Sequence, residues 1–99
     1  MSSKFDEFQT SDRRLVLLRG LHAAAQYRAN AYLLRSYCAA VGHSVSADRI
    51  ESDIAWLAEQ ALLEREVSGG VTVATLTARG ADVAQGIVTV PGVARPQPE

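Results

Sequence analysis

Residues 45–76 read VSADRIESDIAWLAEQALLEREVSGGVTVATL, and this stretch changes from a helical repeat to a strand repeat. Ser46 is a residue type that accepts a hydrogen bond from a backbone N–H in the first turn of a helix. Apolar side chains then recur at helical spacing, at Ile50, Ile54, Leu57 and Ala61. The opposite side carries Asp48, Ser52, Ala55 and Glu59. The sequence therefore predicts an amphipathic helix over residues 46–59, with one buried and one exposed face.

A β-hairpin is predicted directly after this helix. Ser68-Gly69-Gly70 separates residues 62–67 from residues 71–76, and glycine tolerates the positive φ angles that tight hairpin turns need. The second segment is rich in valine and threonine, which favour strands. Both of its faces contain apolar residues, so the sequence does not indicate which face is buried.

Two helices are predicted before residue 46. The first spans residues 11–26, with Ser11 or Asp12 as its N-cap, and the second spans residues 31–41. Asn30 caps the second helix, and Gly42 ends it. A short turn that contains glycine then leads into the helix at Ser46, which is the helix-turn-helix arrangement.

The remaining segments complete one predicted domain. Thr77 caps a last short helix that Gly86 ends, while residues 1–10 are expected to be frayed or partly helical. Residues 87–99 are expected to form an extended tail, whose apolar first part lies on this or another subunit. The predicted fold class is mainly α with a small β-hairpin. It is a winged helix-turn-helix in the order α-α-α-β-β-α, over residues 11–86.

Composition limits the function classes that are open to the chain. Its net charge is −1 over 99 residues, which argues against indiscriminate nucleic-acid binding but leaves room for a local basic patch. No apolar run is long enough to span a membrane, and the first residues lack the apolar core of a signal peptide. We therefore expect a cytoplasmic protein with no membrane partner.

The sequence offers no motif for catalysis, a cofactor or a metal. It lacks a glycine-rich phosphate loop and a nucleophile elbow, so we do not expect an enzyme. Cys38 is the single cysteine, which excludes an intramolecular disulfide and predicts a small buried core residue. His22 and His43 do not stand at metal-ligand spacing from other donors.

Two resemblances add to this interpretation. The segments LAEQALLERE and GGVTVATLTARGADVA resemble the helix, wing and LTxxG signature of bacterial winged-helix regulators of the MarR, PadR and ArsR groups. Between Arg14 and Pro96 the chain also resembles a small family of uncharacterised proteins of Mu-like bacteriophages, often labelled ArsR-like or winged-helix regulators. The matching segments are YRANAYLL, GHSVSADRIESDIAWLAEQALL, VATLTARGADVAQG and VPGVARP. This resemblance implies a phage origin, a bacterial host cell and a gene near those for late morphogenesis and DNA packaging. A lone cysteine departs from the thiolate sites of metal-sensing ArsR proteins.

The predicted function is DNA binding, in transcriptional control or accessory to packaging. The helix over residues 46–59 would enter the major groove, where Arg49 can bond guanine with two hydrogen bonds. The glycine turn would approach the DNA backbone or the minor groove, and the helix ends would contact phosphates. The candidate DNA-binding residues are Arg28, Asn30, Ser44, Ser46, Arg49, Ser52, Gly69 and Gly70.

The charge of the recognition helix keeps a second function open. Asp48, Glu51, Asp53 and Glu59 share this helix, and Arg49 is placed to pair with Asp53 four residues away. The predicted wing carries no basic residue at its tip. The alternative is therefore an adaptor that binds a phage or host protein rather than double-stranded DNA. The broad apolar surface of the first helix and the β-branched tail also predict a homodimer.

Overall fold

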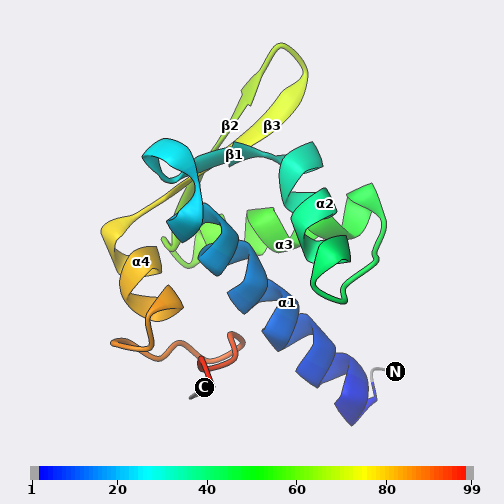
Figure 1. Cartoon of the computed structure of the whole chain (residues 1–99), viewed down its shortest axis with the longest axis vertical. Helices are drawn as coiled ribbons and strands as arrows, with labels where there is room; N and C mark the ends of the chain where they lie inside the picture. The colour runs from blue at the N-terminus through cyan, green and yellow to red at the C-terminus, as the bar shows by residue number, and fades with distance from the viewer. Residues whose placement is uncertain (1–2, 98–99) are drawn as a thin grey trace.

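The structure is a computed structural model that describes residues 3–97. Its elements follow one another as α1 (Lys4–Ala23), the 3₁₀ turn η1 (Ala25–Tyr27), β1 (Arg28–Asn30), α2 (Ala31–Ala40), α3 (Ala47–Glu59), β2 (Leu63–Ser68), β3 (Val71–Leu76) and α4 (Ala78–Ala84). The three strands form an antiparallel sheet in the order β1-β3-β2. The β2–β3 hairpin projects away from the body of the domain (Figure 1).

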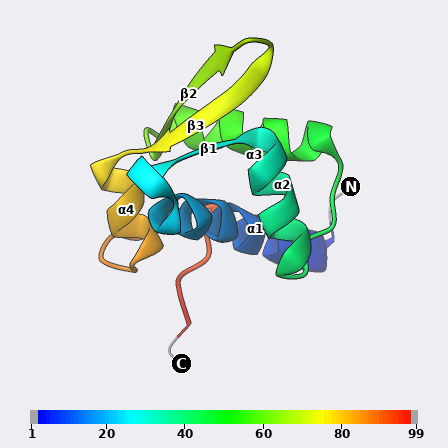
Figure 2. The ribbon, with the colours of Figure 1, turned by 45° about the horizontal axis from the view of Figure 1, so that its top comes forward.

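The helices pack together on one side of the sheet (Figure 2). α1 runs through the middle of this layer, and its leucines belong to one buried cluster with apolar side chains of α2, α3 and α4. The large buried side chains of this core include Leu17, Leu18, Leu21, Leu34, Ile50, Ile54, Leu57 and Leu62. α1 packs against three other helices, so it is buried on more than one side. This burial explains why the apolar residues of α1 extend beyond a single stripe.

The capping residues were predicted correctly for three helices. The Asn30 side chain accepts a hydrogen bond from the Leu33 N–H at 2.8 Å, and Ser46 Oγ accepts one from the Arg49 N–H at 3.1 Å. Thr77 Oγ1 likewise accepts from the Gly80 N–H at 3.0 Å. Each bond satisfies an N–H that has no partner inside its own helix, so these side chains fix where α2, α3 and α4 begin.

The hairpin was also predicted, with its turn one residue shorter than expected. Ser68 pairs with Val71, so the turn consists of Gly69 and Gly70 alone. Their φ angles are +58° and +79°, which is the left-handed pair that a tight two-residue hairpin turn requires. In β3 the alternate residues Thr72, Ala74 and Leu76 face the helices and are buried. This settles which face of the strand is covered.

The strand β1 was not predicted, so the predicted element order was wrong. Arg28, Ala29 and Asn30 pair with Thr75, Ala74 and Val73, and they make the sheet three-stranded. The chain reaches β1 through a sharp turn in which Gln26 and Tyr27 both have positive φ angles. Three residues without β-branched side chains carry almost no local strand signal. Pairing with the distant β3 creates this strand.

The start of the first helix was also predicted wrongly. It begins at Lys4 rather than Ser11 and ends at Ala23 rather than Gln26. The side chain of Ser3 accepts from the Asp6 N–H, and Asp6 accepts from the Ser3 N–H, which is a complete capping box. Residues 4–10, expected to be frayed or partly helical, form its first turns, while residues 1 and 2 lie outside the described part of the chain.

The tail folds back onto its own chain. Val90 and Val93 are buried, and the Ala94 N–H donates to the Ser11 carbonyl of α1 at 3.1 Å. The expected extended arm therefore reaches this subunit between residues 90 and 94. The end of the predicted tail, residues 98 and 99, lies outside the described residues.

Candidate nucleic-acid interface

The outer row of α3 is the centre of the candidate interface. Asp48, Ser52 and Glu59 are exposed and Ala55 is partly covered, while the opposite side of the helix is buried. Arg49 is exposed on the flank of this row. Ser46 lies at its start, where the hydroxyl is already engaged as the helix cap. The row therefore offers one cation and several oxygen atoms to a partner.

Asp53 does not belong to this exposed surface, and its predicted pairing with Arg49 was wrong. The Asp53 side chain is 4% exposed and pairs with Nε of Arg13 from α1, with a second contact from Nη2 at 3.4 Å. The predicted stripe was also wrong at Ala61, which is exposed and adopts a φ of +61° after the helix end. The buried face of α3 thus contains a carboxylate where the pattern indicated only apolar residues.

Arg28 and Asn30 face away from α3. Ala29 between them is buried against the helices, and side chains alternate along a strand, so its two neighbours point to the other face of the sheet. There Arg28 pairs with Glu66 of β2 at 2.6 Å, with both side chains about half exposed. Asn30 is occupied as the cap of α2. The structure therefore does not bring these two candidates together with Arg49.

A cleft of about 220 Å³ separates α2, α3 and the hairpin. Its walls include the exposed ring of Tyr32, the carboxylate of Glu51 and the turn residue Gly70. Arg35 also lines it and donates from Nε to the Val45 carbonyl at 3.0 Å, which holds the loop containing the exposed Ser44. Gly70 is the one turn residue in these walls, so the hairpin tip lies near the first turn of α3.

Glu51 and Arg65 are site residues that the sequence analysis missed. Thr72 Oγ1 donates to Glu51 Oε1 at 2.9 Å, and Arg65 Nη2 lies 3.8 Å from the same oxygen. Strand alternation contained a usable signal, because it places Arg65 on the face opposite to Glu64 and Glu66. That face looks toward α3.

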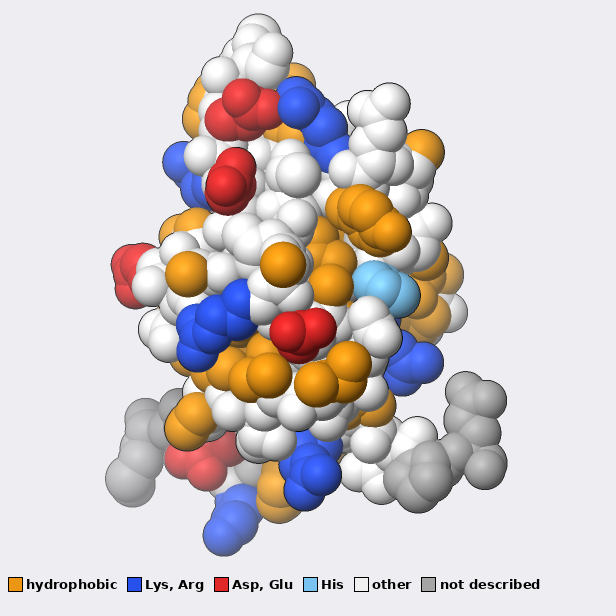
Figure 3. Space-filling view, turned by 90° about the vertical axis from the view of Figure 1, so that its left-hand side faces the viewer, with side chains coloured by type: hydrophobic (Ala, Val, Ile, Leu, Met, Phe, Trp, Pro, Cys, Tyr) orange, Lys and Arg blue, Asp and Glu red, His pale blue; other side chains and the backbone are white. Residues whose placement is uncertain are grey.

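Two of the arginines near α3 and the hairpin are compensated by acids. Arg28 is paired with Glu66, and Arg65 lies near Glu51. Figure 3 draws the side of the molecule that carries α4, and on that face basic side chains are scattered among acidic and apolar ones and form no continuous area. A partner that requires a strongly positive surface would find little of it on that face.

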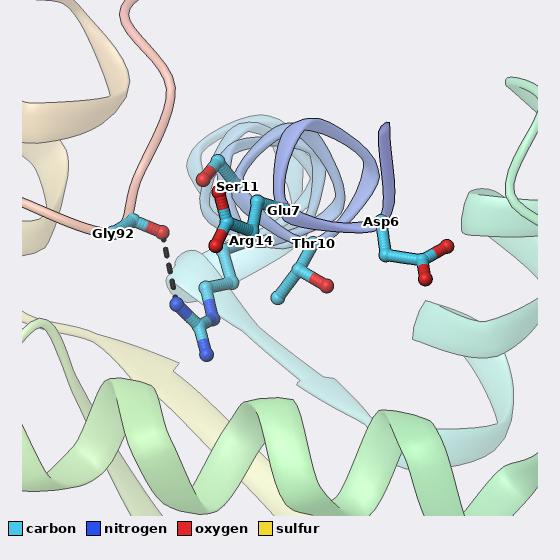
Figure 4. A pocket seen from close by; sticks show the side chains of 6 residues that line it. All are labelled: Asp6, Glu7, Thr10, Ser11, Arg14 and Gly92. Carbon is cyan, nitrogen blue, oxygen red and sulfur yellow. Dashed lines mark hydrogen bonds between the residues drawn. The ribbon is translucent and has the colours of Figure 1, made fainter. Parts of the chain in front are cut away.

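Arg14 and Trp56 occupy the flank of α3 that faces the tail. The Arg14 guanidinium lies 3.8 Å from the Trp56 ring centre, and its Nη1 donates to the Gly92 carbonyl at 3.0 Å (Figure 4). Burial lowers the pKa of Arg14, an effect that the nearby Asp53 carboxylate opposes and Arg13 reinforces. Trp56 is partly buried and packs on the core, as predicted. The flank is therefore a packing contact of the fold.

The potential metal ligands, the helices and the thiol of residues 3–97 bear on other kinds of function. In that part of the chain no three His, Cys, Asp or Glu side chains gather to hold a metal ion. None of its helices is both long and apolar enough to cross a bilayer. Cys38 is fully buried, as predicted, and burial raises the pKa of its thiol to about 11. The thiol is therefore protonated at neutral pH, which is unsuited to a nucleophile or metal ligand.

Comparison with known proteins assigns a family. The chain is 46% identical over 93 residues to a protein of Escherichia phage Mu described as "Uncharacterized protein gp26", and the match covers 94% of this chain and 96% of that protein. The chain belongs to the family of phage Mu gp26. A protein of Haemophilus influenzae, described only as "Uncharacterized protein", is 40% identical over 76 residues, 76% of this chain and 74% of its own length. No family model and no solved structure matches the chain.

The gp26 family match supports the bacteriophage link that the sequence resemblance implied. It covers nearly the full length of both chains, so the comparison includes α1, the hairpin and the tail. Neither relative's description names a ligand or an activity.

Proposed function

We propose that the chain is a phage winged helix-turn-helix protein that binds double-stranded DNA through the N-terminal half of α3. The order helix, strand, helix, helix and hairpin, with β3 between β1 and β2, supports the winged-helix assignment. In that arrangement α2 and α3 form the helix-turn-helix, α3 enters the major groove, and the hairpin is the wing. The role would be transcriptional control or an accessory function in DNA packaging.

The observation that carries this proposal is the exposed outer row of α3 beside the projecting hairpin. Asp48, Ser52 and Glu59 are exposed on a helix whose other face is buried, so the row is available along its length. Arg49 on the flank is the side chain suited to read guanine. The glycine turn, bare of side chains, allows the backbone of a partner to approach closely.

The paired arginines define what kind of DNA binding to expect. Arg28 and Arg65 lie close to glutamates, so they contribute little to attraction for phosphates. Few phosphates would then be neutralised, and affinity would depend only shallowly on salt, with a log–log slope of about −2 to −3. The contact of Arg49 with a base would account for much of the discrimination between DNA sequences.

The test is a fluorescence-anisotropy titration of the full chain with duplex fragments of its own phage genome at low and physiological salt. Arg49→Ala should weaken binding to the best fragment about tenfold or more, because one good bidentate base contact contributes about 1–3 kcal/mol. Lys4→Ala removes the same charge from the first residue of α1 and should leave affinity unchanged.

Two glutamate-to-glutamine variants, each of which removes one negative charge, test which surface contacts DNA. Glu51→Gln releases Arg65 on the α3 side while keeping an acceptor for Thr72, and it should strengthen binding about fivefold. Glu66→Gln releases Arg28 on the opposite face of the sheet and should have a smaller effect. Equal gains from both variants would argue against binding through α3.

A protein-binding adaptor is the second candidate. The observation that favours it is the acidic outer row, where Asp48 and Glu59 are exposed and form no ion pair with any residue between 3 and 97. Such a row suits a basic segment of a phage or host protein. Absence of DNA binding even at low salt would reject the DNA proposal and leave the adaptor as the better explanation.

A further inference from the structure

One face of α1 remains uncovered. Its exposed and partly exposed side chains recur every three or four residues along the helix, and we call this set the α1 stripe: Phe5, Phe8, Asp12, Val16, Arg19 and Ala23. Phe5 is 67% exposed and Phe8 is 64% exposed. Two aromatic side chains this exposed, on a helix end held by a complete capping box, indicate a docking surface rather than a frayed terminus.

The α1 stripe extends onto α2. Tyr37 lies against α1, because a Cβ at Gly20 would come within 2.9 Å of its ring. Leu33 and Val41 lie four residues before and after Tyr37, and all three are exposed to at least 39%. α2 therefore widens the apolar surface beyond a single helix, toward the total area of about 1,200 Å² or more that a stable protein interface buries.

The α1 stripe is complementary, in charge and in side-chain size, to a second copy of the same stripe that runs in the opposite direction. The acid Asp12 precedes the base Arg19, and the large Phe8 precedes the small Ala23, at positions symmetric about a point between residues 15 and 16. Arg19 forms no ion pair with any residue between 3 and 97. Asp12 uses only Oδ2, which lies 2.6 Å from Nε2 of His43. Its side chain is 57% exposed.

We propose that two copies of this chain form a twofold dimer by packing their α1 stripes antiparallel. Asp12 then faces Arg19 of the partner subunit, Phe8 covers Ala23 of the partner subunit, and the two Val16 side chains meet at the axis. A parallel arrangement would set Asp12 against Asp12 and Arg19 against Arg19. Opposed helix dipoles also favour the antiparallel pair. This interface lies on a different surface from α3, so it does not depend on what α3 binds.

The test is sedimentation equilibrium of the full chain with two charge-reversal variants. The unaltered chain should be a dimer, whereas Asp12→Arg and Arg19→Asp should each be monomers, because each sets like charges together at both symmetric contacts. An equimolar mixture of the two variants should again form dimers, since both arginines of the first variant then face both aspartates of the second across the interface. Glu64→Arg on the outer face of the sheet makes the same charge change as Asp12→Arg and should remain a dimer.

Each other outcome would overturn the proposal. An unaltered chain that stays monomeric up to about 1 mM has no dimer of useful affinity. Dimers that persist in both variants must use another surface. Folded monomeric variants that fail to associate when mixed would exclude the antiparallel pairing. Circular dichroism of each variant confirms folding before the association measurement.

Discussion

Arg13 and Asp53 place two opposite charges inside the helical layer, between α1 and α3. Their side chains are 6% and 4% exposed, so both groups have lost most of their hydration. Removing an ion from water costs several kcal/mol, and only the mutual contact and its hydrogen bonds offset that cost. We therefore expect the pair to fix how α1 and α3 meet more than it adds to net stability.

Removing one partner of this pair should be far worse than removing both. Asp53→Asn leaves the buried Arg13 without a counter-ion and should lower the free energy of unfolding by about 3–5 kcal/mol. The double variant Arg13→Met/Asp53→Leu should be more stable than either single variant. Urea denaturation, monitored by circular dichroism, measures the free energy of unfolding of each variant. A loss of less than about 1 kcal/mol for Asp53→Asn would show that Arg13 readily reaches solvent.

Residue roles that depend on neighbours in sequence were predictable, and those that depend on distant neighbours were not. Asn30, Ser46 and Thr77 cap helices as expected, because a cap acts within three residues of itself. Asp53 was misassigned, since its partner lies 40 residues earlier in the chain. Arg28 was grouped with Arg49 in the prediction, because the sequence does not reveal the strand β1, which places Arg28 on the exposed face of the sheet.

At the scale of elements, the junction of β3 and α4 explains the sequence LTARG at residues 76–80. Thr77 caps α4 and also donates from Oγ1 to the Ala61 carbonyl at 2.8 Å. Gly80 lies very close to Leu62 and Leu76. A Cβ at Gly80 would fall inside contact distance of the Leu62 carbonyl oxygen and 2.7 Å from Cδ1 of Leu76. The threonine and glycine are therefore needed to pack α4 against the start of β2.

Gly80→Ala should destabilise the protein although alanine favours helices. The new methyl meets a backbone carbonyl that cannot rotate aside, so α4 must shift from β2, at a cost of about 2 kcal/mol or more. Gly20→Ala in α1 is the matched control, because its closest neighbours are atoms of the Tyr37 ring. This partly exposed ring can move, and Gly20→Ala should be neutral or stabilising. Thermal unfolding of both variants checks the contrast, and equal effects would contradict this role of Gly80.

The predictable elements share strong local signals. α2, α3, α4 and the hairpin all have a capping residue or a glycine turn at their ends, and the sequence marks each of them. The start of α1 was missed although Ser3 and Asp6 form a capping box, because the segment was polar and close to the chain end. β1 could not be found this way, since its three residues become a strand only against β3.

On the scale of the whole molecule, the tail closes the domain on the side opposite the sheet. Val90 and Val93 are buried among the helices, and Gly92 sits against Trp56, where a Cβ would come within 2.9 Å of the ring. Its φ of +95° also favours glycine. The tail thus joins α1 to α3 across a long stretch of sequence.

A chain ending at Gly86 should therefore be measurably less stable. It loses two buried valines and the contact with Trp56, and we expect unfolding to require about 2–4 kcal/mol less free energy. A chain that ends at Pro96 keeps these contacts and is the control. Differential scanning calorimetry should show a lower Tm for the shorter chain only. Equal Tm values would mean that the tail packs without stabilising the domain.

The pairing of β1 with β3 has a consequence for the order in which the chain folds. Residues 28–30 find their partners only at residues 73–75, so the sheet cannot close until most of the chain has been synthesised. The β2–β3 hairpin needs only a two-residue turn and can form early, whereas closing the long loop to β1 costs entropy before any contact repays it. β1 is therefore the late strand, and a newly made chain exposes the free edge of β3 until β1 arrives.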